Sequence, residues 1–271
     1  NPNTGLPGYY QDDQGVRVAL LPLSGNGTAA PTQIFDNPVP TSPYSVFLGY
    51  GSEAFYYIAT SSFDIPSGKV LALFGLEEAF GGVGDAVPGQ EFVFNRTRVR
   101  ADLPVAGTYT VQHPFGTLTF DVTTPGIKAI NYTSDIGVPR DFAAATLGDM
   151  TRFLRPVAPP PAGWIGDGAS VGTVTGSPSG FNKVRITGPV GVNLDGAGNN
   201  FVESKQLTVS GRIPTAVTPI TSYTKSDVPA TGVAPATVTF TDTSTGAPTK
   251  WLWDFGDGTT STVKNPPAKT Y

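Results

Sequence analysis

Alternation of hydrophobic and polar residues, the pattern of half-buried β-strands, is the dominant signal along the chain. It is clearest over residues 108–123, where apolar side chains alternate with threonine and aspartate around the turn sequence His113-Pro-Phe-Gly. Residues 91–100 alternate in the same way, and their three arginines fall on one face. Further strands are predicted at residues 16–21, 54–60, 69–74, 128–132, 183–187 and 206–210.

Helical periodicity appears at only one place in the sequence, over residues 141–154. Asp141 is a suitable N-cap, and apolar residues follow at helical spacing, namely Ala143, Leu147, Met150 and Leu154. We therefore expect one short helix packed on a β framework.

Composition supports an all-β fold. The chain has 33 glycines and 26 prolines in 271 residues, which penalises helix interiors and favours turns between short strands. Two Pro-rich stretches follow the helical segment, at 155–163 and 213–220. We place the main boundary at the second, which predicts multi-domain β-sandwiches: a β-rich region of one or two lobes over 1–213, and a further sandwich over 214–271.

Charge and cysteine content exclude several classes of protein. A formal net charge of −4 gives no field that attracts a polyanion, so we expect no nucleic-acid partner. Cysteine is absent, which removes disulfides and thiolate catalysis.

The longest apolar run, near 70–76, is strand-sized, so no membrane insertion is expected within the chain. The chain opens on Asn1, and its single methionine is Met150, which suggests a start processed by removal of a secretory signal.

The C-terminal 50 residues carry a specific motif. A strand is expected at 236–241, and it is followed by Trp253, Asp254, Phe255, Gly256, Asp257 and Gly258, then by Asn265-Pro266 and Tyr271. This segment, from Ser222, resembles the PKD domain, an immunoglobulin-like β-sandwich common in secreted and surface proteins of bacteria and archaea. From the residues alone, Trp253 is expected in the sandwich core, and Asp254 and Asp257 are expected to brace a tight turn rather than act as acids.

The resemblance implies a further strand after Tyr271, which is where this sequence stops. Two alternatives stay open: the closing strand follows on the same chain, or the sandwich borrows one from a neighbour. The second alternative predicts self-association through β edges, with residues 1–10 as one candidate donor strand.

Residues 1–213 resemble an uncharacterised module of prokaryotic secreted and surface proteins. The shared phrases are GLPGYYQD from Gly5, EAFYY from Glu53, LALFGLEEAF from Leu71, YTVQHPFG from Tyr109 and VTGSP from Val174. No activity is attached to that module, so the resemblance indicates location only.

No catalytic constellation emerges from the sequence, and we expect no enzyme activity. His113 is the only histidine and is interpreted as a structural residue at the end of a hairpin strand. Glu77 and Glu78 follow an apolar run, but adjacent residues cannot flank one substrate bond, because they point in different directions on a strand or a helix. We expect them in a short helical or turn segment with one carboxylate exposed.

Oxygen-rich loops are the remaining candidates for ligand sites. Asn193, Asp195 and Asn199, and separately Asp12-Asp13, offer the oxygen ligands that calcium prefers, although turn chemistry explains them equally well. Calcium is therefore the one cofactor considered. Asn26, Asn95 and Asn131 begin glycosylation sequons, of which Asn26 lies in the most exposed context and Asn95 shares the parity of apolar residues.

These observations predict an extracellular, cell-surface protein with a structural or adhesive role, and more specifically a self-associating subunit of a filament or surface array. Its partners would be copies of itself, other surface proteins or glycans. The alternative is a non-catalytic, carbohydrate-binding part of a secreted polysaccharide-degrading system.

Overall fold

The computed structural model of the chain describes residues 5–21, 36–82, 84–214, 222–226, 235–244, 248 and 250–271. The chain divides into two units, Asn1–Pro214 and Thr215–Tyr271. Both are built from β-strands, so the all-β prediction is confirmed.

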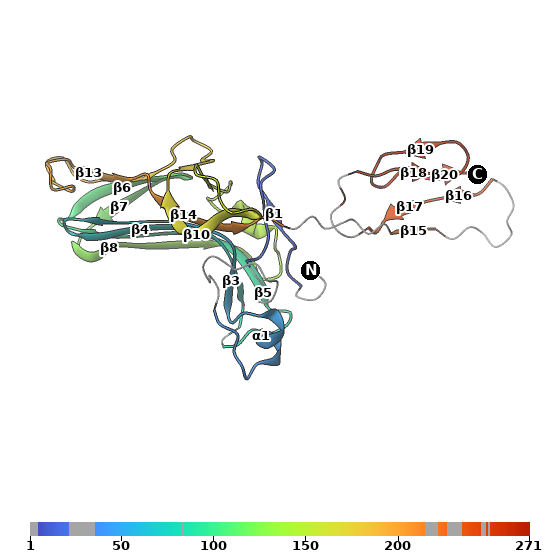
Figure 1. The fold of residues 1–271 in the computed structure, drawn as a ribbon, viewed down its shortest axis with the longest axis horizontal. Helices are drawn as coiled ribbons and strands as arrows, with labels where there is room; N and C mark the ends of the chain where they lie inside the picture. The colour runs from blue at the N-terminus through green and yellow to red at the C-terminus, as the bar shows by residue number, and fades with distance from the viewer. Residues whose placement is uncertain are drawn as a thin grey trace. The chain divides into compact units, whose positions relative to one another are not determined.

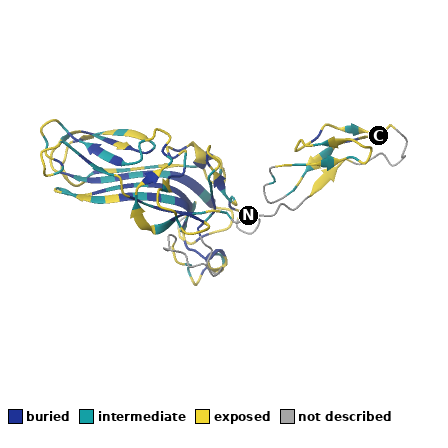
Figure 2. Ribbon diagram, turned by 45° about the horizontal axis from the view of Figure 1, so that its top comes forward, coloured by how far each residue is buried: buried dark blue, intermediate teal, exposed yellow. Residues whose placement is uncertain are grey.

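A six-stranded antiparallel sheet forms the larger layer of the first unit, in the order β10-β14-β3-β4-β5-β8 (Figure 1). Its strands are β3 (Glu53–Ile65), β4 (Gly68–Phe80), β5 (Glu91–Leu103), β8 (Gly126–Ile136), β10 (Trp164–Gly172) and β14 (Leu207–Arg212). Buried and less buried residues alternate along the first half of β4 and throughout most of β5, as a sheet with one covered face requires (Figure 2).

A four-stranded antiparallel sheet, in the order β13-β12-β6-β7, covers one face of the first. Its strands are β6 (Gly107–His113), β7 (Gly116–Val122), β12 (Val184–Thr187) and β13 (Phe201–Ser204). Aromatic rings join the two layers: the centroid of Phe74 on β4 lies 5.1 Å from those of His113 and Phe115. The two sheets therefore share one hydrophobic core.

Every segment of the first unit in which alternation predicts a strand contains one. The hairpin at 108–123 is β6 and β7, with Pro114 and Phe115 in the turn. The short pairs β1 (Tyr10–Gln11) with β2 (Arg17–Val18), and β9 (Arg155–Pro156) with β11 (Val174–Thr175), complete the unit. Of these four, only β2 lies within a predicted strand.

The predicted helix at 141–154 is corrected to a single 3-10 turn, η1 (Ala144–Leu147). The chain is extended again at Gly148, and core side chains bind the backbone beyond it. The Asn95 amide exchanges two hydrogen bonds with the backbone of Met150, and the carboxylate of Asp12 accepts the N–H of Phe153. These bonds replace those that a helix would make.

The α-helix of the first unit, α1 (Pro43–Leu48), lies where none is predicted. The side chain of Ser42 accepts the N–H of Ser45, Pro43 opens the helix, and Gly49 closes it with a φ of 84°. These are ordinary helix start and stop signals. Six residues are too few to show a hydrophobic period, which is why the pattern missed the helix.

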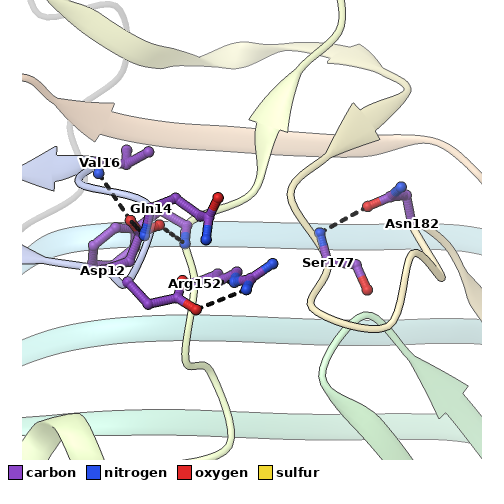
Figure 3. Close-up of polar contacts among 8 residues, drawn as sticks. Asp12, Gln14, Val16, Arg152, Ser177 and Asn182 are labelled. Atoms are coloured by element: carbon purple, nitrogen blue, oxygen red, sulfur yellow. Dashed lines mark hydrogen bonds and ion pairs between the residues drawn. The ribbon is translucent and has the colours of Figure 1, made fainter.

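Asp12 fixes the β1–β2 turn to the segment that precedes β9 (Figure 3). One carboxylate oxygen accepts the N–H groups of Gln14 and Val16 at 2.9 and 2.8 Å, and the other accepts that of Phe153 at 3.1 Å. Asp13 binds the guanidinium of Arg152 through two contacts of 2.7 Å. Both aspartates, considered above as cation ligands, are thus engaged by groups of the protein.

The N-terminal segment does not lie free as a donor strand over its described part. Leu6 is 2% exposed and Tyr10 is 8% exposed, and both belong to the core of the first unit. This corrects the suggestion that residues 1–10 serve as a donor; residues 1–4 of that stretch lie outside the described residues.

Among its described residues, the second unit contains three two-stranded ladders. They are β15 (Tyr223–Lys225) with β17 (Phe240–Asp242), β16 (Thr237–Val238) with β20 (Lys269–Thr270), and β18 (Trp253–Asp254) with β19 (Thr260–Ser261). The strand predicted at 236–241 is present as β16 and β17, interrupted at Thr239, whose N–H bonds to the side chain of Ser226.

Candidate functional site

An open groove lined by aromatic side chains lies in the second unit and has a volume of about 580 Å³. Tyr223 on β15 and Phe240 on β17 place their ring centroids 5.8 and 5.9 Å from that of Trp253 on β18. The other aromatic lining residues are Trp251, Phe255 and Tyr271, and polar side chains at the groove are Ser222, Asp242, Ser244, Lys250 and Asp254. Flat rings beside polar groups suit either an added β-strand or a sugar.

Trp253 is only half-buried in the structure, whereas the sequence predicts it in the core of the sandwich. Its indole Nε1 donates to the carbonyl of Val263 at 3.0 Å, while the side chain also lines the groove. Trp251 also lines the groove, and its side chain helps to hold the pKa of Asp242 below the ordinary value. Trp251 and Trp253, two residues apart, therefore both face the groove, and Trp253 also bonds to the backbone of Val263.

The Asp254–Gly258 segment forms the tight turn that its sequence predicts. Asp254 accepts the N–H of Gly256 at 2.9 Å, and Gly256 has a φ of 77° that favours glycine. Asp257 accepts the N–H of Thr259 at 3.0 Å. Lys269, 2.7 Å away, and these hydrogen bonds lower the pKa of Asp257 to about 2. Both aspartates are placed to brace the turn.

Glu77 and Glu78 both lie on β4 and both are buried, so the expectation of a turn segment with an exposed carboxylate is wrong. They do point to opposite faces. Glu77 folds over Gly75, which has no side chain in the way, and its carboxylate meets Arg96 of β5 at 2.7 Å. Arg96 also holds Asp135 of β8 at 2.6 Å, so one guanidinium joins three adjacent strands. Burial raises the pKa of Glu77, and Arg96 opposes that shift.

Glu78 lies on the opposite, inner face, fully buried, and neither of its carboxyl oxygens has a hydrogen-bond partner among the described residues. Burial, with the nearby carboxylates of Glu91 and Glu53, raises the pKa of Glu78 to about 9. The buried Tyr50 hydroxyl, which interacts electrostatically with Glu78, is likewise unpaired. Glu78 is therefore a neutral acid at pH 7.

Glu91 differs from Glu78 because donors surround it. Burial favours its neutral form, but the N–H of Gly89 and the hydroxyl of Tyr44, each 3.0 Å from one carboxylate oxygen, hold its pKa below the ordinary value. Two carboxyls with opposite shifts are the pattern of an acid–base pair. Glu78 is fully enclosed, however, so the pair has no access to a substrate. The sequence could have revealed this cluster, because Glu78 stands two residues after Leu76 and four after Phe74, on the side of the β4 alternation that faces the core.

His113 is buried at the end of β6, as the structural interpretation predicts. Its ring stacks on Phe74, and its Nδ1 accepts the N–H of Phe115 at 3.3 Å. Burial lowers the pKa of His113 to about 4, despite the opposing charge of Asp149. The imidazole is thus neutral at pH 7.

The shift of His113 predicts a pH-dependent stability difference. The unfolded chain takes up the proton near the ordinary pKa of 6.5, whereas the folded chain resists until about pH 4. The stability that wild type gains over His113→Gln is therefore full above pH 6.5 and should shrink by about 3 kcal/mol as the pH falls to 4. Denaturant unfolding of both proteins at pH 7 and pH 4 measures it. A difference that is constant with pH would contradict the assignment.

The Asn193–Asn200 loop uses its oxygens internally. Asp195 accepts the N–H groups of Ala197 and Asn199 at 2.8 and 3.0 Å, and Asn193 accepts that of Gly198 at 2.9 Å. Among the described residues, no group of three or more acidic, histidine or cysteine side chains is arranged to hold a metal ion. Turn chemistry thus accounts for the loop, and calcium binding stays a prediction.

The three sequons differ in accessibility. Asn95 is buried, and both polar atoms of its amide bond to Met150, which leaves no room for a glycan. Asn131 is exposed on β8. Asn26 lies outside the described residues. Asn131 is therefore the one described sequon with an exposed asparagine.

Residues 216–271 match the family model of the PKD domain, which confirms the resemblance drawn from the motif at 253–258. No curated protein and no solved structure matches the chain. Within the part of the chain that the structure describes, no helix combines the length and apolarity needed to cross a membrane.

Proposed function

We propose that the protein is an extracellular structural and adhesive protein of the cell surface that self-associates as a subunit of a filament or surface array. The observation that carries the proposal is the aromatic groove of the PKD unit, where strand edges and exposed rings lie together. PKD domains are typical of extracellular proteins, which supports the location. An apolar groove beside short strands favours an added β-strand, because backbone groups and rings are satisfied together.

We propose further that the chain is not an enzyme. Glu77 is held by Arg96, and Glu78 and His113 are enclosed in the core, so none of the three reaches a substrate. In the groove, Asp242 accepts the N–H of Ser244 at 3.1 Å, and Asp254 accepts that of Gly256. These acids are engaged in turns rather than poised for proton transfer.

Light scattering and electron microscopy of the full chain over a range of concentrations test the main proposal. We expect oligomers or polymers whose mass rises with concentration, and Tyr223→Ser should weaken association because Tyr223 is 55% exposed and lines the groove. Tyr9→Ser, an aromatic change in the first unit, is the control. A monomer at every concentration would overturn the proposal.

The second candidate is carbohydrate binding without catalysis. It is favoured by the combination of ring faces and polar side chains, such as Ser222 and Lys250, along the same groove. Glycan-array binding by a monomer, lost in Tyr223→Ser, would support this candidate over self-association.

A further inference from the structure

The outer edge of β8 is the longest strand edge left unpaired by the described residues of the first unit. β8 spans 11 residues, pairs with β5 on one side, and ends the six-stranded sheet. The opposite edge strand, β10, has nine residues, and its register shifts twice. A long row of unpaired backbone groups is a template for another strand.

β8 carries few of the features that normally protect an edge. From Ile130 to Ile136 it keeps an unbroken register with β5, with Ile130 opposite Ala101 and Ile136 opposite Asn95. This stretch contains no proline, glycine or lysine. Proline, inward charge and bulges are the usual means of blocking edge pairing. The edge is therefore open to a strand along seven consecutive residues, 130–136.

Apolar side chains line the same open side of the sandwich. β7, the edge of the four-stranded sheet, lies beside β8, and the rings of Phe120 and Tyr132 meet across the two layers at 5.5 Å. Both rings are only partly buried, as is Leu118, and Ile136 is 40% exposed. A strand added to β8 would bring its own inner-face residues over this seam and remove apolar area from water.

We propose that β8 pairs antiparallel with β8 of a second copy of the chain, joining the two six-stranded sheets edge to edge. This inference rests on the proposed self-association and names one surface for it. The strand carries Lys128 near its beginning and Asp135 near its end. Antiparallel pairing brings Lys128 of each copy to the end of the pair where Arg96 holds Asp135 of the other copy, whereas parallel pairing would set the two Lys128 side chains beside each other. A second copy also repeats the seam, so Tyr132 and Ile136 of both copies are covered together.

Cysteine cross-linking tests the register, because the chain has no cysteine of its own. Asn131 and Thr133 are exposed, lie opposite Arg100 and Arg98 on the outer face, and sit near the middle of the open stretch. In an antiparallel self-pair, residues at the middle face their own copies. We expect Asn131→Cys or Thr133→Cys to form a disulfide dimer at least about tenfold faster than Ser62→Cys, since pairing raises the effective thiol concentration. Ser62 is exposed on β3, inside the same sheet.

A charge variant tests the pairing itself. Asn131→Lys sets like charges against each other at the middle of the pair, so the full chain should form smaller assemblies than wild type and Ser62→Lys at the same concentration, since only the groove contact of the second unit is left. Thr133→Lys serves as the second variant, and an unchanged melting temperature shows that the fold is kept. If wild type associates, and both variants associate equally well without specific cross-linking, the β8 pairing is overturned while the proposed function stands. If wild type stays monomeric, the proposed function and the pairing both fall.

Discussion

Glu78→Gln should stabilise the first unit at neutral and alkaline pH, by about 3 kcal/mol at pH 7. In the folded protein the pKa of Glu78 is raised from 4.5 to about 9 by burial and by Glu91 and Glu53. The unfolded chain therefore releases this proton from about pH 4.5 upward, while the folded chain keeps it. Stability is lost progressively as the pH rises through this window, and glutamine, which is neutral throughout, removes the loss.

Glu78→Gln should remove no hydrogen bond of the folded protein, because neither carboxyl oxygen of Glu78 has a hydrogen-bond partner among the described residues. Glutamine keeps the shape of the protonated acid. Denaturant unfolding at pH 5, 7 and 8.5 measures the effect, which should grow with pH. Asp64→Asn, at an exposed carboxylate on β3, is the matched control and should change little. Equal stability of Glu78→Gln and wild type at pH 8.5 would contradict the raised pKa.

The strands could be predicted from the sequence because period-two alternation reports which face of a sheet is covered. This holds for the β6–β7 hairpin and for the start of β4, where Val70, Ala72 and Phe74 all lie in the core. The same parity extends to Glu78, so its burial was available from the pattern. The general preference of carboxylates for the surface concealed it.

The error at 141–154 came from treating apolar spacing as sufficient for a helix. Met150 and Leu154 are indeed buried, but they lie in irregular, non-helical backbone whose polar groups bond to other parts of the chain. Asn95, 55 residues away from Met150, supplies two of those bonds. Such long-range partners leave no trace in local spacing, and tertiary contacts override helix propensity.

The candidate groove could be predicted only in part. The family motif located Trp253 and its turn, but the groove also needs Tyr223 and Phe240 from two other strands. Their approach depends on the pairing of β15 with β17 and on the placement of β18 beside them. Strand register between distant segments is set by the whole fold. From the sequence it was therefore possible to point to Trp253, but not to predict that Tyr223 and Phe240 would lie beside it.

Arg96→Met should cost about 1–3 kcal/mol of stability at pH 7, the cost of leaving buried polar groups without their partner, because Glu77, with a pKa raised to about 7, takes up a proton when its cation is lost. Methionine keeps the aliphatic packing of the side chain but leaves Glu77, 1% exposed, without its cation. The pKa of Glu77, already raised by burial, then rises further. The acid escapes part of the penalty by taking up a proton, so the loss should be smaller at pH 5 than at pH 7.

Arg98→Met provides the matched control, because Arg98 lies on the same face of β5 but binds the neutral side chain of Thr133 at 3.1 Å. It should cost less than about 1 kcal/mol, as neutral-partner surface contacts do. Adding Glu77→Gln to Arg96→Met should recover much of the lost stability, since no buried charge then stays unpaired. Urea unfolding of wild type, Arg96→Met, Glu77→Gln and the double variant measures the coupling, and Arg98→Met is unfolded alongside them as the control. If Arg96→Met costs no more than Arg98→Met, the three-strand ion cluster does not stabilise the sheet.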